Sequence, residues 1–277
     1  MNTEATPGEN APRVSVVMGI AGVDVYLQAA IDSILNQTFK DFEFIIVVDE
    51  GDSSMGQQIL ALYPKENRIR ILQSPSLGGL AHALNMGIGQ ARGEYIARMD
   101  GDDISLPDRL MEQVRFLDEN KDVAVLGCRV PMIDSNSRKI NREFPYYQTN
   151  KGIRRALPFR NPLMHPALMF RKSALLAVNG YKYGNSAEDY EMFIRMARNP
   201  DLKFHNLDKV LFTYRRHNLQ ATNLNRVKSN YYEKSGFLFT EFLRSSSWRY
   251  LGGILVMHPI VYRIRMFFRK QLRGNAD

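Results

Sequence analysis

The segment Glu94–Asn120, EYIARMDGDDISLPDRLMEQVRFLDEN, decides the fold because it holds a strand, an acidic turn and a helix in one run. Residues 94–99 predict a short strand, which passes directly into the turn Asp100–Asp103. Pro107 suits the first position of a helix, and we expect that helix to continue to about residue 120. A strand followed by a turn and a helix is the repeating unit of an α/β fold.

The same alternation continues on both sides of this segment. Strands are predicted at 14–18, 42–48, 68–72 and 123–128, and helices at 23–36, 53–62 and 77–91. We therefore expect an α/β domain with a mostly parallel, Rossmann-like sheet flanked by helices. Two of the strands end in acidic residues, Asp49 and Asp100. Because ligands of open α/β sheets bind at the carboxyl ends of strands, both residues are expected at one ligand-binding edge.

Beyond Cys128 the alternation weakens, and five prolines between residues 131 and 166 indicate a region rich in loops. The elements predicted there are a strand at 165–170, helices at 172–178 and 188–198, and a strand pair at 203–207 and 210–214. The rest of the chain reads as helical and basic. We expect a single core domain with halves at 13–128 and 129–225, a flexible N-terminus at 1–12 and a basic helical C-terminal appendage at 226–277.

The positive charge is concentrated in the last quarter of the chain. The net charge is +8, yet residues 201–277 alone hold 14 basic and 5 acidic residues, which leaves the first 200 residues close to neutral. The uncharged stretch Tyr250–Tyr262 follows Trp248 and precedes a basic tail. This pattern favours contact with an anionic membrane surface over nucleic acid. The alternatives are a solvated basic face and a helix packed on the domain.

The turn Asp100–Asp103 carries the strongest chemical signal. Its three carboxylates repel one another unless a cation shares them. Hard oxygen ligands select Mg²⁺ or Mn²⁺, ions that also bind the phosphate groups of substrates. The alternative is an acidic turn that is favoured by the dipole of the following helix.

Two further acidic groups allow a structural and a functional interpretation. Asp49 could accept hydrogen bonds from a nucleotide, although Asp, Gly and Ser are also ordinary turn residues. Glu188 and Asp189 begin a helix, where Ser186 and Asp189 have the spacing of a capping box. If Asp189 points into a cleft instead, it can act as a general base.

Several other site classes lack their motifs. The sequence has no GxxxxGK[ST] loop and no GxSxG, its glycines at 87, 89 and 93 are wrongly spaced for a dinucleotide fingerprint, and its five histidines show no paired zinc spacing. The single cysteine, Cys128, excludes a disulfide scaffold and a cysteine-based zinc site. Residues 1–12 do not resemble a secretory signal, and no uncharged apolar run reaches the roughly 20 residues that span a bilayer.

The order of these groups along the chain resembles the family 2 glycosyltransferases, which have the GT-A fold: Asp49 after one strand, Asp100–Asp103 after another, and Glu188-Asp189-Tyr190 on a helix. The similarity extends to AIDSILNQTF at 30–39, GLAHALN at 79–85, ARGEYIARMDGDDISLPDRL at 91–110 and Gly180-Tyr181. It covers about residues 12–216. Two segments depart from the family pattern, namely 18–22, which lacks a Tyr-Asn pair, and 49–52, which is DEGD in place of DDGS.

The resemblance implies transfer of a sugar from a nucleotide diphosphate donor, usually a UDP-sugar, with inversion at the anomeric carbon. The half at 13–128 would bind this donor. Asp49, Asp100 and Glu188 would contact it, and Asp102, Asp103 and Asp100 would hold Mn²⁺ or Mg²⁺ on its diphosphate.

The half at 129–225 would bind the acceptor, and Asp189 would take the proton from the acceptor hydroxyl. One base and one metal suffice for a single displacement, whereas a glycoside hydrolase needs an opposed pair of carboxyl groups. No QxxRW signature of a processive synthase is present, which favours the addition of single sugars.

We therefore expect a metal-dependent hexosyltransferase or N-acetylhexosaminyltransferase that acts on a lipid-linked or surface-glycan acceptor, as in lipopolysaccharide and other bacterial polysaccharide biosynthesis. It would work in the cytoplasm, peripherally at the inner face of the cell membrane. The alternatives are a sugar nucleotidyltransferase-like enzyme and a noncatalytic, basic membrane-binding module.

Overall fold

The computed structural model describes residues 11–22, 24–49, 54–75, 79–182, 187–217 and 227–261 of the 277-residue chain, without the side chains of residues 49, 142, 143, 227 and 228. The expected flexible N-terminus therefore lies almost wholly outside the described residues, and so does the basic tail after residue 262.

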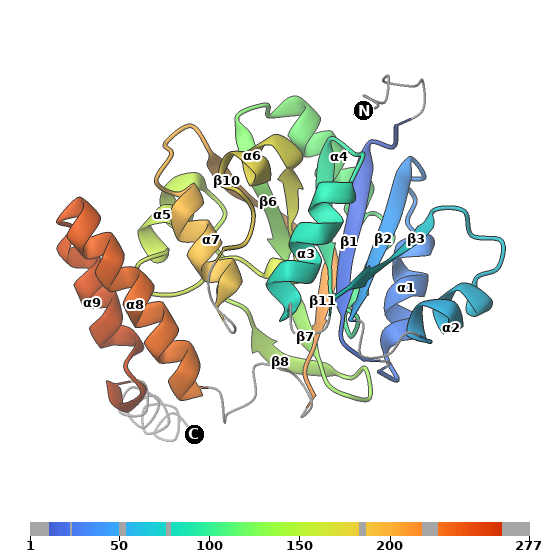
Figure 1. Cartoon of the computed structure of the whole chain (residues 1–277). Helices are drawn as coiled ribbons and strands as arrows, with labels where there is room; N and C mark the ends of the chain where they lie inside the picture. Colours follow the sequence, from blue (N-terminus) through green and yellow to red (C-terminus); the bar gives the residue numbers. More distant parts are fainter. Residues whose placement is uncertain are drawn as a thin grey trace.

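A seven-stranded sheet forms the centre of the molecule (Figure 1). Its strands, in spatial order, are β10 (Lys203–Val210), β6 (Val123–Arg129), β9 (Met169–Arg171), β4 (Tyr95–Met99), β1 (Val14–Ile20), β2 (Phe42–Asp49) and β3 (Ile69–Ser74). Neighbouring strands pair in parallel except at β9, which runs antiparallel to both β4 and β6. The expectation of a mostly parallel sheet is thus confirmed.

Helices cover both faces of this sheet, because successive residues of its strands point to opposite sides. On β1, Val16 and Met18 belong to one core cluster and Val17 to the other. The first cluster packs against α1 (Leu27–Leu35), α2 (Met55–Leu62) and α4 (Arg109–Glu119), and the second against α3 (Gly79–Gln90), α5 (Asn150–Ala156), α6 (Lys172–Ala177) and α7 (Glu188–Met196). Strands buried on both faces explain the continuous apolar runs in the sequence.

A smaller sheet has the order β5 (Ile104–Ser105), β11 (Phe212–Arg215), β7 (Pro131–Ile133) and β8 (Lys139–Glu143). Its composition corrects the strand pair expected at 203–214: β10 joins β6 in the large sheet, whereas β11 pairs with β5 and β7. The strand expected at 165–170 is also wrong in its first half, because His165–Ala167 form a 3-10 turn before β9. Helix α5 and strands β7 and β8 lie in the region that is expected to be rich in loops.

The C-terminal appendage forms two packed helices, α8 (Val227–Ser245) and α9 (Trp248–Met257), at one end of the domain (Figure 1). Leu238 of α8 is fully buried in the second core cluster, and Glu241 is buried between Arg198 and Arg244. Gly253 of α9 lies so close to the domain that a Cβ atom there would sit 1.8 Å from the Pro158 carbonyl oxygen. Among the described residues, no helix combines the length and apolar character needed to cross a bilayer.

Two of the sequence motifs, residues 79–85 and Gly180-Tyr181, contact each other. The Asn85 side chain of α3 donates to the Tyr181 carbonyl at 2.7 Å and accepts from the Tyr181 N–H at 2.9 Å. Gly180 has a φ of +58°, and a Cβ atom there would lie 2.3 Å from the Asn85 side-chain oxygen. Only glycine fits this turn without strain. The contact ties the segment before α7 to α3, on the face of the sheet that carries the second core cluster.

Candidate active site

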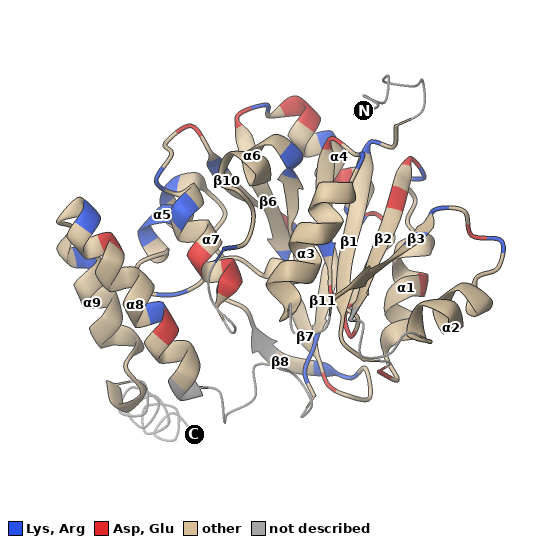
Figure 2. Cartoon of the chain, viewed as in Figure 1, with Lys and Arg blue, Asp and Glu red and all other residues tan. Residues whose placement is uncertain are grey.

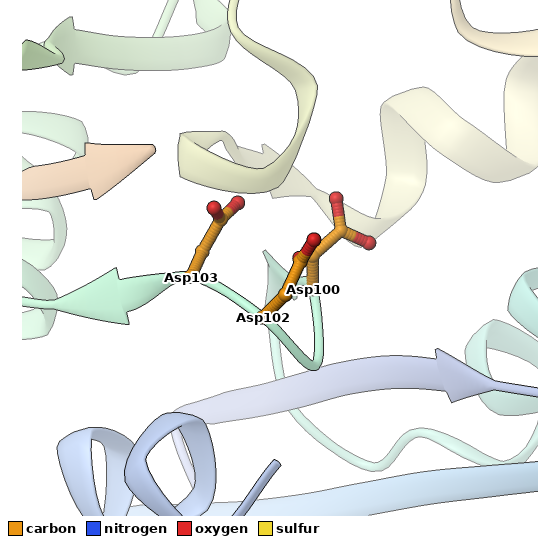
Figure 3. Close-up of side chains that lie close together, drawn as sticks. All are labelled: Asp100, Asp102 and Asp103. Atoms are coloured by element: carbon orange, nitrogen blue, oxygen red, sulfur yellow. The ribbon is translucent and has the colours of Figure 1, made fainter. Parts of the chain in front are cut away.

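Asp100, Asp102 and Asp103 lie on the turn that connects β4 with β5 (Figure 3). One carboxylate oxygen from each lies within 4.8 Å of the others. The turn projects from the carboxyl end of β4, which is the edge where α/β sheets bind ligands. The structure therefore gathers the three predicted metal ligands into one group.

A buried arginine supports the first member of this triad. Arg98 on β4 is only 2% exposed, and its guanidinium forms an ion pair with Asp100 and donates to the Met99 carbonyl. Burial raises the pKa of Asp100, and the charge of Asp102 raises it further, whereas Arg98 acts in the opposite direction. Arg98 thus offsets part of the cost of burying a carboxylate beside a second one.

The third member, Asp103, is fully buried and only half satisfied. Its Oδ1 accepts a hydrogen bond from the Arg215 N–H at 2.7 Å, but its Oδ2 has no hydrogen-bond partner among the described residues. Burial and the charges of Asp100 and Asp102 raise the pKa of Asp103 well above its usual range. An orphaned buried carboxylate oxygen beside two other carboxylates fits a hard divalent cation, since such ions take oxygen ligands.

A histidine after β11 completes the surroundings of the triad. His217 Nε2 lies 2.9 Å from Asp102 Oδ2 and 3.9 Å from Asp24 Oδ2, and its ring contacts Tyr26 at a centroid distance of 5.0 Å. The Arg215 side chain donates to the Asp102 carbonyl at 2.8 Å. The strand end therefore holds the acidic turn through both its backbone and its side chains.

A second carboxylate group lies at the start of α7. Asp189 Oδ1 accepts the Tyr190 N–H at 2.6 Å, and Asp189 Oδ2 accepts the Asn161 amide at 2.8 Å. Burial raises the pKa of Asp189, and it raises the pKa of Glu188 to about 7 with help from the negative charge of Asp189. A carboxyl group whose pKa is raised by burial holds a proton more readily, which suits proton transfer.

The C-terminal appendage contributes a cation to this second group. The Lys234 ammonium of α8 lies 5.4 Å from the centre of the Tyr190 ring. Burial lowers the pKa of Lys234, and the charges of Asp189 and Glu188 oppose that effect. Lys234 in turn favours the ionised form of Asp189. Figure 2 shows acidic residues at the start of α7 and basic residues on α5, α8 and α9.

The two carboxylate groups are electrostatically coupled. Arg98 interacts with both Asp100 and Glu188, and the charge of Asp189 contributes to the raised pKa of Asp100. The structure therefore brings five of the six predicted site residues into one region. The sixth, Asp49, ends β2 next to β1 on the same sheet, but its side chain is not described. The capping role considered for Ser186 falls outside the described residues, and α7 has no side-chain cap from Ala187.

Sequence reasoning missed four members of the site: Arg98, Asn161, His217 and Lys234. Arg98 could have been found, because a charge in the middle of a strand that is buried on both faces requires a partner. Asn161, His217 and Lys234 act over separations of 28, 115 and 45 residues from their carboxylates, and no local pattern marks them.

Comparison with known proteins gives a consistent result. Residues 15–177 match the profile described as "Glycosyl transferase family 2". The chain is 37% identical over 233 residues to the O-antigen biosynthesis glycosyltransferase WbnJ of Escherichia coli, an alignment that covers 83% of this chain and 89% of that protein. It is 32% identical over 212 residues to the putative glycosyltransferase EpsE of Bacillus subtilis, covering 74% of each chain.

Two solved structures share the fold. S. aureus TarS 1-349 in complex with UDP-GlcNAc superposes with a TM-score of 0.65 at 19% identity, covering 83% of this chain and 66% of that one. The mannosyltransferase PcManGT of Pyrobaculum calidifontis, in complex with GDP-Man and Mn²⁺, gives 0.63 at 14% identity, covering 91% and 70%. At these identities the likeness concerns the fold alone, and it confirms the expected GT-A architecture.

Proposed function

The chain belongs to glycosyl transferase family 2, and on that premise we propose that it is an inverting, metal-dependent enzyme that moves a sugar from a UDP-sugar to a hydroxyl group of a glycan or glycolipid. The observation that carries this proposal is the meeting of two carboxylate groups at one sheet edge. One group has the composition of a metal site, and the other offers a carboxylate with a raised pKa.

In the proposed reaction, Asp102 and Asp103 hold Mn²⁺ or Mg²⁺ together with Asp100. The bound ion supplies positive charge that neutralises the departing diphosphate. Arg98 forms an ion pair with Asp100 and orients its carboxylate, and His217, whose Nε2 lies 2.9 Å from Asp102 Oδ2, orients Asp102. Asp49, at the end of β2, and Glu188, at the start of α7, contact the donor.

Asp189 removes the proton from the acceptor hydroxyl as that oxygen attacks the anomeric carbon. The Asn161 amide fixes the direction of its carboxylate, and Lys234 favours its ionised form. Because a single base acts in one displacement, the anomeric configuration inverts. Residues 13–128 bind the donor in this scheme, and residues 129–225 bind the acceptor.

A donor screen tests the proposal. Purified protein is incubated with UDP- and GDP-linked hexoses and N-acetylhexosamines, with and without Mn²⁺, and release of the nucleoside diphosphate and thermal protection are measured. We expect turnover and protection with a UDP-sugar that both depend on the metal. Release of pyrophosphate from a nucleoside triphosphate would indicate a nucleotidyltransferase instead, and a lack of any nucleotide binding would indicate a noncatalytic module.

The acceptor is proposed from the relatives and from the appendage. The name of the E. coli relative refers to O-antigen biosynthesis, which supports a lipid-linked or surface-glycan acceptor in polysaccharide or lipopolysaccharide assembly. Exposed apolar side chains on α8 and α9, among them Phe239, Leu243, Trp248 and Leu255, lie near Arg244 and Arg249 in the sequence. Apolar anchors beside cations fit an anionic membrane surface, here the inner face of the cell membrane.

Vesicle co-sedimentation tests the membrane contact. The full chain should bind vesicles that contain phosphatidylglycerol better than neutral vesicles, and the double variant Trp248→Ser/Leu255→Ser should lose most of that binding. A matched pair of exposed apolar residues at the other end of the domain, Leu60 and Leu62, provides the control when both are changed to Ser. Equal binding by all three proteins would remove the membrane from the proposal.

A further inference from the structure

A cavity of about 360 Å³ lies where the two sheets meet, and neither carboxylate group is part of its lining. Residues at the ends of β6 and β10 and residues of β7, β8 and β11 line it. Strands β4 and β6 run in the same direction because both are antiparallel to β9. The carboxyl end of β6 therefore opens at the same sheet edge as Asp100, and the cavity lies beside the proposed donor site rather than behind it.

The walls of the cavity are connected to both carboxylate groups. On one side, Ser137 lines the cavity and its hydroxyl accepts from the Arg215 guanidinium at 2.9 Å, while the Arg215 N–H holds Asp103. On the other side, Pro162 lines the cavity directly after Asn161, which holds Asp189. A molecule in the cavity would thus contact segments that position both the metal ligands and the proposed base.

The lining suits a sugar ring. Phe144 and Tyr146 provide aromatic surface, and Tyr146 is fixed by a hydrogen bond of 2.9 Å from its hydroxyl to the Asn206 carbonyl. Ser137 and Thr213, which both carry hydroxyl groups, belong to the same lining. Sugars present apolar C–H faces and hydroxyl edges, which match aromatic rings and short polar side chains. The volume also falls in the range of small-molecule sites, about 300–1,000 Å³.

The charge of the lining is positive. Arg129 and Lys139 line the cavity, and none of the described lining residues is acidic. Arg129 forms an ion pair with Asp208 and stacks on the Tyr146 ring at 4.0 Å. Lys139, by contrast, is exposed and carries a charge for which no ion pair occurs within the described part of the chain. An anion in the cavity would balance it.

We propose that this cavity binds a sugar residue of the acceptor that carries a carboxylate or a phosphate group, next to the residue whose hydroxyl group reacts at Asp189. The proposal rests on the transferase function proposed above, because it assigns the substrate class of the acceptor half. The aromatic rings contact the sugar face, and Lys139 contacts the anionic group.

Ligand-observed NMR with three probes tests this assignment: methyl glucuronide, glucose 6-phosphate and the neutral methyl glucoside. Each is titrated against the full chain saturated with UDP and Mn²⁺. Both anionic probes should bind, and the neutral probe should bind about two- to fivefold more weakly. A preference for one anion identifies the carboxylate or the phosphate as the group that is recognised.

Two variants and two matched controls locate the binding. Phe144→Ala should lower the affinity for the anionic probes about tenfold, and Lys139→Gln should lower it about two- to fivefold. Phe39→Ala, which truncates a half-buried phenylalanine just before β2, and Lys121→Gln, which alters an exposed lysine just before β6, should leave probe binding unchanged. Equal binding of the neutral probe, or equal loss in variants and controls, would overturn the proposal.

The UDP affinity of each variant is measured in the same samples. Phe144 and Lys139 do not belong to the donor site, so their variants should bind UDP as the unaltered chain does. If the unaltered chain does not bind UDP, the proposed transferase function itself is refuted. Normal UDP binding without binding of the anionic probes would refute only the assignment of the cavity.

Discussion

The two carboxylate groups of the site differ in how their charge is balanced. The triad of Asp100, Asp102 and Asp103 concentrates three acids on one turn, with a buried arginine on one side and an orphaned carboxylate oxygen on another. In the pair at the start of α7, both oxygens of Asp189 accept hydrogen bonds and a lysine lies nearby. The triad thus leaves a buried oxygen that the proposed cation would bind, whereas both oxygens of the proposed base, Asp189, already accept hydrogen bonds.

The largest effect on activity is expected from a substitution in the pair of Glu188 and Asp189. Asp189→Asn removes the proposed base but keeps the size of the side chain, so sugar transfer should fall by about 10²–10⁴-fold. Binding of UDP with Mn²⁺, measured by calorimetry, should stay nearly the same because the triad is intact. Glu188→Gln is the matched control and should retain far more activity. Full sugar transfer by Asp189→Asn would show that Asp189 is not the general base.

Asp103→Asn tests whether the triad of Asp100, Asp102 and Asp103 binds a cation. The buried Asp103 carboxyl has a raised pKa in the folded chain, so the folded state binds its proton more tightly than the unfolded state does. Without metal, this residue therefore makes the protein less stable as the pH rises above about 4. The variant should raise the metal-free free energy of unfolding at pH 8 by about 1–2 kcal/mol and should lose most of the stabilisation by Mn²⁺.

Denaturant unfolding with and without Mn²⁺ measures both quantities. Asp118→Asn is the control with the opposite sign, because Asp118 is bound by Arg13 and Tyr95, which lower its pKa despite partial burial. That variant should be less stable at pH 8 and should respond normally to Mn²⁺. If Asp103→Asn were destabilised and still gained full stability from Mn²⁺, the triad would not be a metal site.

The smallest effect is expected from Lys234→Met. Its ammonium favours the ionised form of Asp189, so its removal should raise the pH at which activity is lost on the acidic side. Activity at pH 6 should fall by about two- to fivefold relative to pH 8, where the loss should be small. The pH profile of kcat/KM measures this shift. Lys203→Met is the control. It removes a lysine that is paired with Asp122 at the start of β10, and it should leave the pH profile unchanged.

The sequence predicts the fold of residues 13–128 well because the signals there are local. Mainly apolar segments between helical patterns mark β1, β2 and β6, which are seven, eight and seven residues long, and the acidic turn after β4 is contiguous. Residues 129–225 are different, because β9 is only three residues long and runs antiparallel between β4 and β6, which share one direction. Such a short strand is defined by its neighbours rather than by its own residues.

The same distinction applies to the site. Asp100, Asp102 and Asp103 were predictable as a carboxylate group because all three lie within four consecutive residues of the sequence. Lys234 was not, since it reaches Asp189 from a helix whose position depends on burial of Leu238 and Glu241. A residue whose role depends on the packing of one helix against the rest of the domain leaves no spacing to recognise.

The close approach of Gly253 to the domain has a further consequence for that lysine. A Cβ atom at Gly253 would meet the Pro158 carbonyl at 1.8 Å and the Leu238 side chain of α8 at 3.2 Å. The glycine therefore sets the register of the α8–α9 hairpin along the domain. A slide of α8 by one residue would move its side chains about 1.5 Å along the axis and about 100° around it, which would turn the ammonium group away from Tyr190. The absence of a side chain at Gly253 thus helps to fix the position of the Lys234 ammonium, which lies more than a dozen residues earlier in the chain.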